Sequence, residues 1–286
     1  MDYIFGIRYK ASSIHFITHG FTVLSAAMTF VLEVRTVQSA AFKTLIEAAK
    51  ELLTDTCIEF DETGMRIVSM DTSHIVLVHL KLDAGKFEYY HCKQKLVLGV
   101  NMINFHKLIK TLNGNDTLTL FVDEINYNEL GIRCENLEKN TRTTYKLNLL
   151  DLDNPRITVN PAEFQSVITL PSTDFQKICR DCHNIADMVE IKNVGNQLIF
   201  SCKGDFCSQE TVLSDQDGVN RIGNGNTDEI VQGMFSLKFL VLFTKCTNLS
   251  STVELFLKND YPLITRFAVA SLGELKLCLS PAAVNP

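Results

Sequence analysis

The two halves of the chain resemble each other, and this internal repeat limits the folds that the sequence can adopt. Residues 100–122 align without gaps with residues 235–257, and residues 40–53 pair more loosely with residues 173–186. In both copies of the longer segment, the pattern predicts a helix, a polar turn and an alternating strand. Self-similarity of this kind indicates repeated structural units, so we predict two similar domains.

Apolar residues recur at helical spacing in two of the predicted helices, which gives each of them one face to bury. These positions are Phe42, Leu45, Ile46, Ala49, Leu52 and Leu53 in residues 40–53, and Phe175, Ile178, Cys179, Cys182 and Ile185 in residues 173–186. Ser39 and Ser172 directly precede the two segments. Serine is a favoured N-cap residue, so we expect both side chains to cap their helices.

Runs of β-branched residues between the helices indicate that strands outnumber helices. The clearest runs are residues 66–70, 75–80, 117–122, 251–257 and 264–269. We therefore predict an α+β fold with two domains of antiparallel sheet, at residues 28–150 and 165–282, each with two helices. A connector at residues 151–164 joins them, because Pro155 and Pro161 interrupt both helical and strand periodicity there.

Residues 1–27 precede the first clear strand and belong to neither predicted domain. Their apolar stretch, residues 14–24, is interrupted by polar residues and a glycine at His15, Thr18, His19 and Gly20, whereas the core of a secretory signal is continuous. We expect this segment to be an appendage, or to lie upstream of a true start at Met28. Sequencing the N terminus of the natural protein distinguishes the two.

Charge and cysteine usage exclude several classes of protein. The net charge of −6 argues, taken alone, against a surface that is basic all over. Nine cysteines, an odd number in a chain of this length, favour reduced thiols over a disulfide framework. No apolar run approaches the roughly 18 to 20 residues that a membrane helix needs, so we expect no membrane insertion.

The helix faces opposite the apolar stripes are basic, although the chain as a whole is acidic. The cations on these faces are Lys43, Lys50, Lys107, Lys110, Lys177, Arg180, Lys238 and Lys245. On any single helix, a solvated face of mixed charge is the commoner explanation. Four such faces in an acidic protein favour a surface that attracts phosphates without reading bases. Lysine, a point charge on a flexible stem, suits mobile and sequence-independent contact.

Several segments resemble the proliferating cell nuclear antigen family of eukaryotic-type sliding clamps, in the family's order and over nearly all of residues 32–281. The most specific are LEVRTVQ (32–38), SMDTSHIVLVHL (69–80), LLDLD (149–153), FQKICRD (175–181), LFTKCTNLSSTV (242–253) and LGELKLCLSP (272–281). The resemblance implies the DNA-clamp fold and a homotrimeric ring whose helices face duplex DNA. It also implies a processivity factor without catalytic residues, metal or cofactor.

The same resemblance implies a set of partners and a location. The partners are double-stranded DNA bound without sequence preference, DNA polymerase, an ATP-driven clamp loader, and other replication and repair proteins. The location is the nucleus, or a viral replication site if the protein is viral. Subunits of the family join edge strand to edge strand, which would set residues 143–147 of one chain against residues 206–213 of the next.

The family binds short partner peptides in an apolar pocket beside the interdomain connector. The matching positions here are Met70, His74, Ile75, Leu77, Ile157, Val159, Pro262, Cys278, Ser280 and Pro281. Without the resemblance, these residues would be interpreted as ordinary sheet packing. Cys278 stands where the family usually has an aromatic residue, and the family's acidic C-terminal tail is replaced by AAVNP, which leaves partner preference open.

Other kinds of site are less well supported. Residues 179–183 match the C-x-x-C-H pattern of covalent haem attachment, but both cysteines lie on an apolar helix stripe. His74 and His79 would point to opposite faces of a strand, which disfavours zinc. Asp151 and Asp153 lack a neighbouring base, and no nucleotide-binding glycine motif is present. A second clamp-like interpretation is a diverged subunit of a hetero-oligomeric, checkpoint-like ring, which the mass of the purified chain would test.

Overall fold

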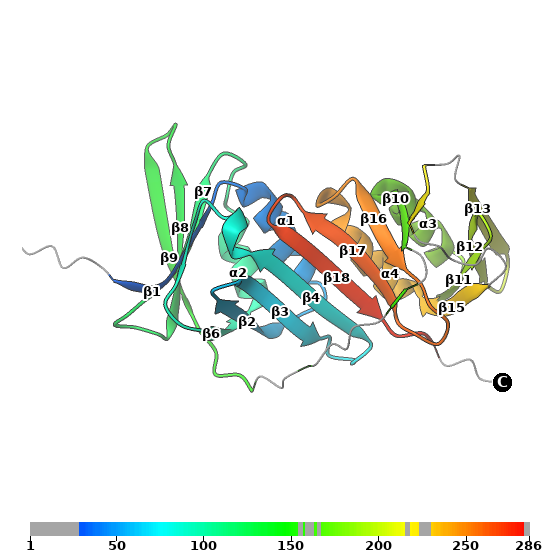
Figure 1. Ribbon diagram of the computed structural model, residues 1–286, viewed down its shortest axis with the longest axis horizontal. Coiled ribbons are helices and arrows are strands. Elements are labelled where there is room, and N and C mark those ends of the chain that lie inside the picture. Colours follow the sequence, from blue (N-terminus) through cyan, green and yellow to red (C-terminus); the bar gives the residue numbers. More distant parts are fainter. Residues whose placement is uncertain are drawn as a thin grey trace, which may run out of the picture.

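Three antiparallel sheets lie in a row along the molecule, the largest in the middle (Figure 1). The computed structural model describes residues 29–153, 157, 163–164, 167–214, 218–222 and 230–282. The predicted N-terminal appendage, Pro155, Val159 and Pro161 lie outside these described residues. Within them, the predicted α+β class with two similar halves is confirmed.

The first half of the chain contains strands β1 to β9 and helices α1 and α2. Their bounds are β1 Phe30–Thr36, α1 Ser39–Ala49, β2 Asp55–Asp61, β3 Gly64–Met70, β4 Val76–Asp83, the 3-10 helix η1 Ala84–Lys86, β5 Tyr89–Cys92, β6 Leu96–Asn101, α2 Met102–Ile109, β7 Thr117–Asp123, β8 Glu129–Asn136 and β9 Thr141–Asn148.

The second half repeats this plan with strands β10 to β18. Their bounds are β10 Val167–Pro171, α3 Ser172–His183, β11 Met188–Val194, β12 Gln197–Lys203, β13 Ser208–Ser214, β14 Asn220–Ile222, β15 Val231–Ser236, α4 Leu237–Phe243, the 3-10 helix η3 Thr244–Asn248, β16 Thr252–Phe256, β17 Leu263–Val269 and β18 Gly273–Leu279.

The middle sheet combines strands from both halves of the chain. Its order is β14-β10-β16-β17-β18-β4-β3-β2-β6, and the two halves meet where β18 pairs antiparallel with β4, from Gly273 opposite Leu82 to Leu279 opposite Val76. The end sheets are β5-β1-β7-β8-β9 and β13-β12-β11-β15. Each end sheet is therefore a copy of one half of the middle sheet, with β9 equivalent to β18 and β13 equivalent to β4.

The helices lie behind the middle sheet in Figure 1 and bury the predicted apolar stripes. Phe42 of α1 is fully buried and meets Phe105 of α2 edge to face, with 6.4 Å between ring centroids. In the second half, Phe175 of α3 packs against Phe200 of β12 at 6.3 Å. Fully burying one such side chain contributes roughly 1.5–3 kcal/mol, so these faces fix the helices on the sheets.

The predicted serine N-caps are wrong. The N-caps of α1 and α3 are Gln38 and Pro171, and neither makes a side-chain capping hydrogen bond. Ser39 is instead buried in the first turn of α1, where its hydroxyl donates to the Asn113 carbonyl at 3.0 Å. Ser172 is also buried in the first turn of its helix. Packing against neighbouring loops thus overrides the local capping preference of serine.

Candidate nucleic-acid and peptide interfaces

The eight predicted cations all lie in the helix layer or at its helix ends. Lys50 and Lys110 are the C-cap residues of α1 and α2, and Lys245 lies in η3, because the α-helical geometry of α4 ends at Phe243. Contacts of α1 with α2 and with η3, and of α3 with α4, join the helices of both halves into one layer. Six of the cations are exposed, whereas Lys43 and Lys50 are half-buried.

Most of these cations have no carboxylate at ion-pair distance among the described residues. The exception is Lys50, whose ammonium group pairs with Glu51. Lys43 donates to the Leu112 carbonyl at 3.1 Å and so ties α1 to the loop after α2. Lys238 lies over the ring of Phe239, 5.6 Å from its centroid. The helix layer therefore presents positive charge that the described part of the chain leaves largely uncompensated.

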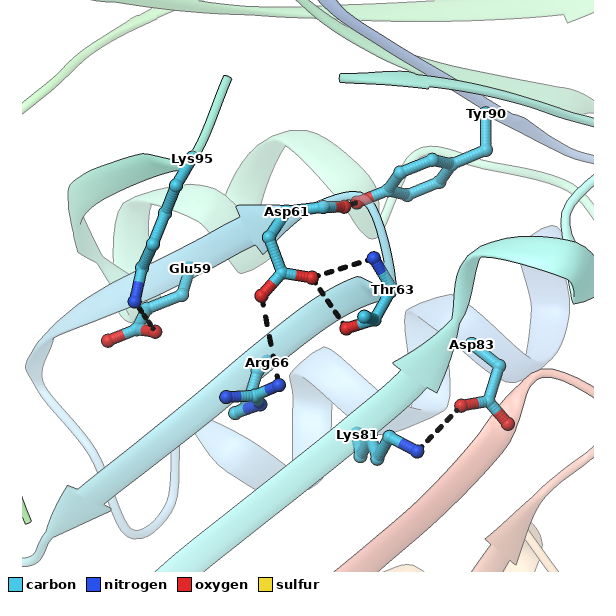
Figure 2. Close-up of polar contacts among 8 residues, drawn as sticks. All are labelled: Glu59, Asp61, Thr63, Arg66, Lys81, Asp83, Tyr90 and Lys95. Carbon is cyan, nitrogen blue, oxygen red and sulfur yellow. Dashed lines mark hydrogen bonds and ion pairs between the residues drawn. The ribbon is translucent and has the colours of Figure 1, made fainter. Parts of the chain in front are cut away.

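Cations on the outer face of the middle sheet are paired instead. Figure 2 shows Lys95 bound to Glu59 at 2.9 Å, Arg66 facing Asp61 at 3.8 Å and Lys81 bound to Asp83 at 3.0 Å. Farther along this face, ion pairs include Lys276–Glu274 at 2.7 Å and Arg266–Glu254 at 3.0 Å. Charges on the sheet face thus largely neutralise one another.

Asp61 anchors one end of this paired network. Hydrogen bonds from Thr63 and the charge of Arg66 lower the pKa of its carboxyl group. Partial burial acts to raise this pKa but is outweighed. The Tyr90 hydroxyl donates to the Asp61 carbonyl oxygen at 2.7 Å, which links β5 to the β2–β3 turn (Figure 2). Burial raises the pKa of Tyr90, so it remains a neutral donor. The Tyr90 hydrogen bond therefore ties the middle sheet to the end sheet that contains β5.

His106 of α2 belongs to the basic helix face, although it was absent from the predicted set. It lies one turn before Lys110 and is half-buried. Partial burial lowers its pKa, as do the charges of Lys50 and Lys110, while Glu47 and Glu51 act in the opposite direction. Its spacing of four residues from Lys110 was the sequence signal that could have identified it.

An apolar row crosses the outer face of the middle sheet and contains three of the predicted peptide-pocket residues. Successive cross-strand pairs link Met70 to Leu77, Leu77 to Cys278, Cys278 to Ile264, and Ile264 to Phe256. All five side chains are half-buried, so each leaves part of its surface accessible. Ile264 and Phe256 were missed, although they alternate with buried residues in their strands as outward-facing residues should.

The remaining predicted pocket residues lie around this row. Met70, His74 and Ile157 line one cavity of about 420 Å³, together with residues of β2 and the start of the connector. The Ser280 amide donates to the Ile75 carbonyl at 3.1 Å, which places these two residues side by side. Pro262, in the β16–β17 turn, and Pro281 are half-buried, and Val159 lies outside the described residues.

A tight turn before β4 shapes this cavity. His74 adopts a left-handed backbone conformation, with φ of 56°, and is exposed. The carboxylate of Asp71 accepts hydrogen bonds from the amides of Ile75 at 2.8 Å and Val76 at 2.7 Å, which holds the turn closed. Burial acts to raise the pKa of Asp71, but hydrogen bonds from Ser73, Val76 and Ile75 outweigh it and lower the pKa. Asp71 thus stays ionised and fixes His74 at the cavity.

The start of the connector is fixed on the edge of β6. Leu150 donates its amide to the Gly99 carbonyl at 2.8 Å, and the two residues form an isolated antiparallel bridge. A Cβ atom at residue 99 would lie only 2.2 Å from the Leu150 carbonyl oxygen, so glycine is required there. At the far end of the connector, Phe164 meets Phe256 of the apolar row at 5.4 Å. The connector therefore begins and ends against the face that carries the predicted pocket.

The cysteine pair that matches the haem pattern lies in the core. Cys179 and Cys182 of α3 are 1% and 0% exposed. Burial raises the pKa of both thiols, that of Cys182 to about 12. Neither thiol can reach a porphyrin without unfolding α3, so both act as core residues. In the part of the chain that the structure describes, no group of three or more histidine, cysteine or carboxylate side chains could hold a metal ion.

Among the described residues, no helix is both long and apolar enough to cross a lipid bilayer. The sequence does match known families. The model of the proliferating cell nuclear antigen N-terminal domain covers residues 31–156, and that of the C-terminal domain covers residues 158–282. A relative from Paramecium bursaria Chlorella virus 1, named "Probable DNA polymerase sliding clamp 1", is 36% identical over 255 residues, which span 88% of this chain and 97% of the relative. The two domain matches, the repeated fold and the basic helix layer together show that this chain belongs to the proliferating cell nuclear antigen family of DNA sliding clamps.

Proposed function

We propose that this sliding clamp closes as a homotrimeric ring and holds duplex DNA by mobile phosphate contacts along its helix layer. The observation that carries the proposal is the contrast in charge pairing. Sheet-face cations have carboxylate partners within the chain, whereas most helix-layer cations have none among the described residues. Phosphates would supply the missing counter-charge without reading the base sequence.

Ring closure is supported by the internal symmetry of the chain. Within one chain, β18 of the second half pairs with β4 of the first half and completes the nine-stranded sheet. Their equivalents, β9 and β13, are edge strands at opposite ends of the molecule. Pairing β9 of one subunit with β13 of the next would repeat the internal seam and satisfy both edges. Repeating this heterologous contact from subunit to subunit would close a ring. The family resemblance implies that the ring contains three subunits.

The same equivalence gives the register of the contact between subunits. Lys276 of β18 stands opposite His79 of β4, and their equivalents by the repeat are Thr144 of β9 and Glu210 of β13. Thr144 would therefore lie opposite Glu210 of the neighbouring subunit. Arg142 and Lys146 flank Thr144 on the same face of β9, so two cations would lie diagonal to that carboxylate.

A change of charge at Glu210 tests this register. Glu210→Lys should weaken the trimer, because it sets a cation against Arg142 and Lys146, whereas Thr144→Lys should preserve or strengthen it. Light scattering on the purified chain should give about 97 kDa, three times the 32.2 kDa of one chain. A monomer would instead favour a subunit of a hetero-oligomeric ring, and an unchanged trimer in Glu210→Lys would refute the register.

Function would then follow from topology, since a closed ring cannot leave circular DNA without opening. A polymerase bound through a short peptide at the apolar row would remain near its template at high effective concentration. Opening would need an ATP-driven loader, and other replication and repair proteins would use the same docking row. The test is retention on circular DNA after loading: linearising the circle should release the ring. Equal retention on linear and circular DNA would contradict encirclement.

A further inference from the structure

Two carboxylates interrupt the basic helix layer at the place where the two halves of the chain meet. Glu47 in α1 and Glu51 just after it share a cavity of about 180 Å³ with Arg180 of α3 and Lys245 of η3. The cavity lies at the contact between α1 and η3, the junction between the helices of the two halves. Two cations of the proposed DNA-facing surface thus share one space with two carboxylates.

Other cations of the layer face the same two carboxylates. Glu51 forms an ion pair with Lys50. The charges of Glu47 and Glu51 act to raise the pKa of His106, whereas those of Lys50 and Lys110 lower it. Glu47 and Glu51 are exposed, so solvent or a passing phosphate can reach them. The carboxylates therefore lie among the cations to which the proposed function assigns the phosphates of a duplex.

Local helix stability does not explain their presence. Glu47 and Glu51 lie at or just beyond the C-terminal end of α1, which ends at Ala49. The carbonyl end of a helix carries partial negative charge, so carboxylates there are unfavourable by a few tenths of a kcal/mol and cations such as Lys50 are favoured. The chain thus keeps two carboxylates where the helix dipole disfavours them and where no apolar packing needs them.

We propose that Glu47 and Glu51 are internal counter-charges that limit how tightly the clamp holds DNA. They repel the backbone phosphates that would approach Arg180 and Lys245, and Glu51 competes with those phosphates for its ion-pair partner Lys50. A ring that must slide needs contacts that break easily, and carboxylates at the junction of the two halves weaken the contacts there. The inference rests on the proposed DNA-holding function of the helix layer, and it names the residues that set the strength of that hold.

The test is equilibrium binding of the full chain to a short linear duplex across a salt series. Glu47→Gln and Glu51→Gln should each tighten binding by on the order of two- to fivefold, the scale of an exposed ion pair. The double variant should also steepen the dependence of log affinity on log salt, because Lys50, freed from its ion pair with Glu51, adds up to about 0.9 to the slope. Glu62→Gln, an exposed carboxylate in the β2–β3 turn, is the matched control and should change neither quantity.

A second background tests whether the effect acts through the junction. In a Lys245→Ala chain, the gain from Glu47→Gln should shrink, because one of the cations that would draw a phosphate to the shared cavity is gone. Thermal unfolding and solution mass should match the parent chain in every variant.

The outcomes separate the two proposals. Absence of salt-dependent DNA binding by the parent chain would overturn the proposed function itself. Salt-dependent binding by the parent chain, with equal or weaker binding by both glutamine variants, would overturn only the counter-charge inference. Loss of folding in both variants would assign the carboxylates a structural role and overturn it as well.

Discussion

The helix layer and the outer face of the middle sheet carry similar residue types but use them differently. On the sheet face, Arg66, Lys81 and Lys95 each have a carboxylate partner in the same or a neighbouring strand or loop. In the helix layer, Lys110 and Arg180 have no such partner in the described chain. Paired charges hold a surface together, whereas unpaired charges of one sign are available to a ligand of the other sign. The net charge of the chain therefore indicates little about its function, whereas the presence or absence of ion-pair partners distinguishes the two surfaces.

The largest expected effect comes from removing unpaired cations. Replacing Lys50, Lys110, Arg180 and Lys245 together with alanine should weaken binding to duplex DNA at least tenfold and flatten its salt dependence, because counterion release is lost. The measurement is duplex affinity from about 50 to 200 mM salt, with the trimer checked by light scattering.

The matched control removes the same number of paired cations from the sheet face. Alanine at Arg66, Lys81, Lys95 and Lys276 makes the same change in net charge. If this variant lost as much DNA affinity as the helix-layer variant, long-range charge rather than the helix face would explain binding.

The next effect tests whether the sheet face binds by apolar contact. Leu77→Lys places a cation within the apolar row, between Met70 and Cys278. It should weaken binding of a fluorescent peptide bearing a glutamine and paired aromatic residues roughly 10- to 100-fold, the effect of losing an apolar anchor. Duplex binding by the helix layer should not fall. Ala268→Lys, on the same face but outside the row, controls for added charge. A strong response of peptide affinity to salt would contradict apolar docking.

A smaller effect concerns pH. Burial and the charges of Lys50 and Lys110 lower the pKa of His106, so this side chain is neutral at pH 7 and gains charge only below its ordinary value of about 6.5. Duplex binding should strengthen about twofold as the pH falls from about 7.5 to 5.5, because a new positive charge joins the helix face. The difference between the parent chain and His106→Gln isolates this residue. Identical pH profiles in the two proteins would exclude it from the DNA-facing surface.

The lowered pKa of His106 also has a consequence for stability. The folded chain binds fewer protons at this site than the unfolded chain, so the histidine's contribution to stability is fully present above the unfolded pKa of about 6.5 and is lost as the pH falls from there through the lower folded pKa. Because burial also lowers the pKa of His79, together with Lys276 and other cations, the same sign applies at the middle sheet. The free energy of unfolding should therefore fall on acidification, opposite in direction to the expected gain in DNA binding.

The smallest effect should follow from breaking one sheet-face ion pair. Lys95→Ala removes one ion-pair partner of Glu59 at a site where the lysine side chain is 55% exposed. Exposed pairs contribute about 0.2–1 kcal/mol, so the free energy of unfolding should fall by less than about 1 kcal/mol. Urea unfolding measures it. A loss of several kcal/mol would mean that the paired network is a cooperative unit rather than a set of solvated pairs.

Features that depend on local periodicity could be predicted from the amino-acid sequence alone. The repeat, the α+β class, the apolar stripes that include Phe42 and Phe175, and the basic helix faces all follow from the spacing of residues along one segment. A helix presents residues four apart on one face wherever it lies, so these predictions needed no knowledge of neighbours.

Features that depend on contacts between distant segments became known only from the folded structure. The β18–β4 pairing aligned Leu77 with Cys278 into an apolar row, and the contact of α1 with η3 brought Glu47 to Lys245. Burial also turned Ser39 away from its predicted capping role. Strand register and loop packing are set by the collective burial of the whole core, and no local pattern encodes which far residue will stand opposite a given one.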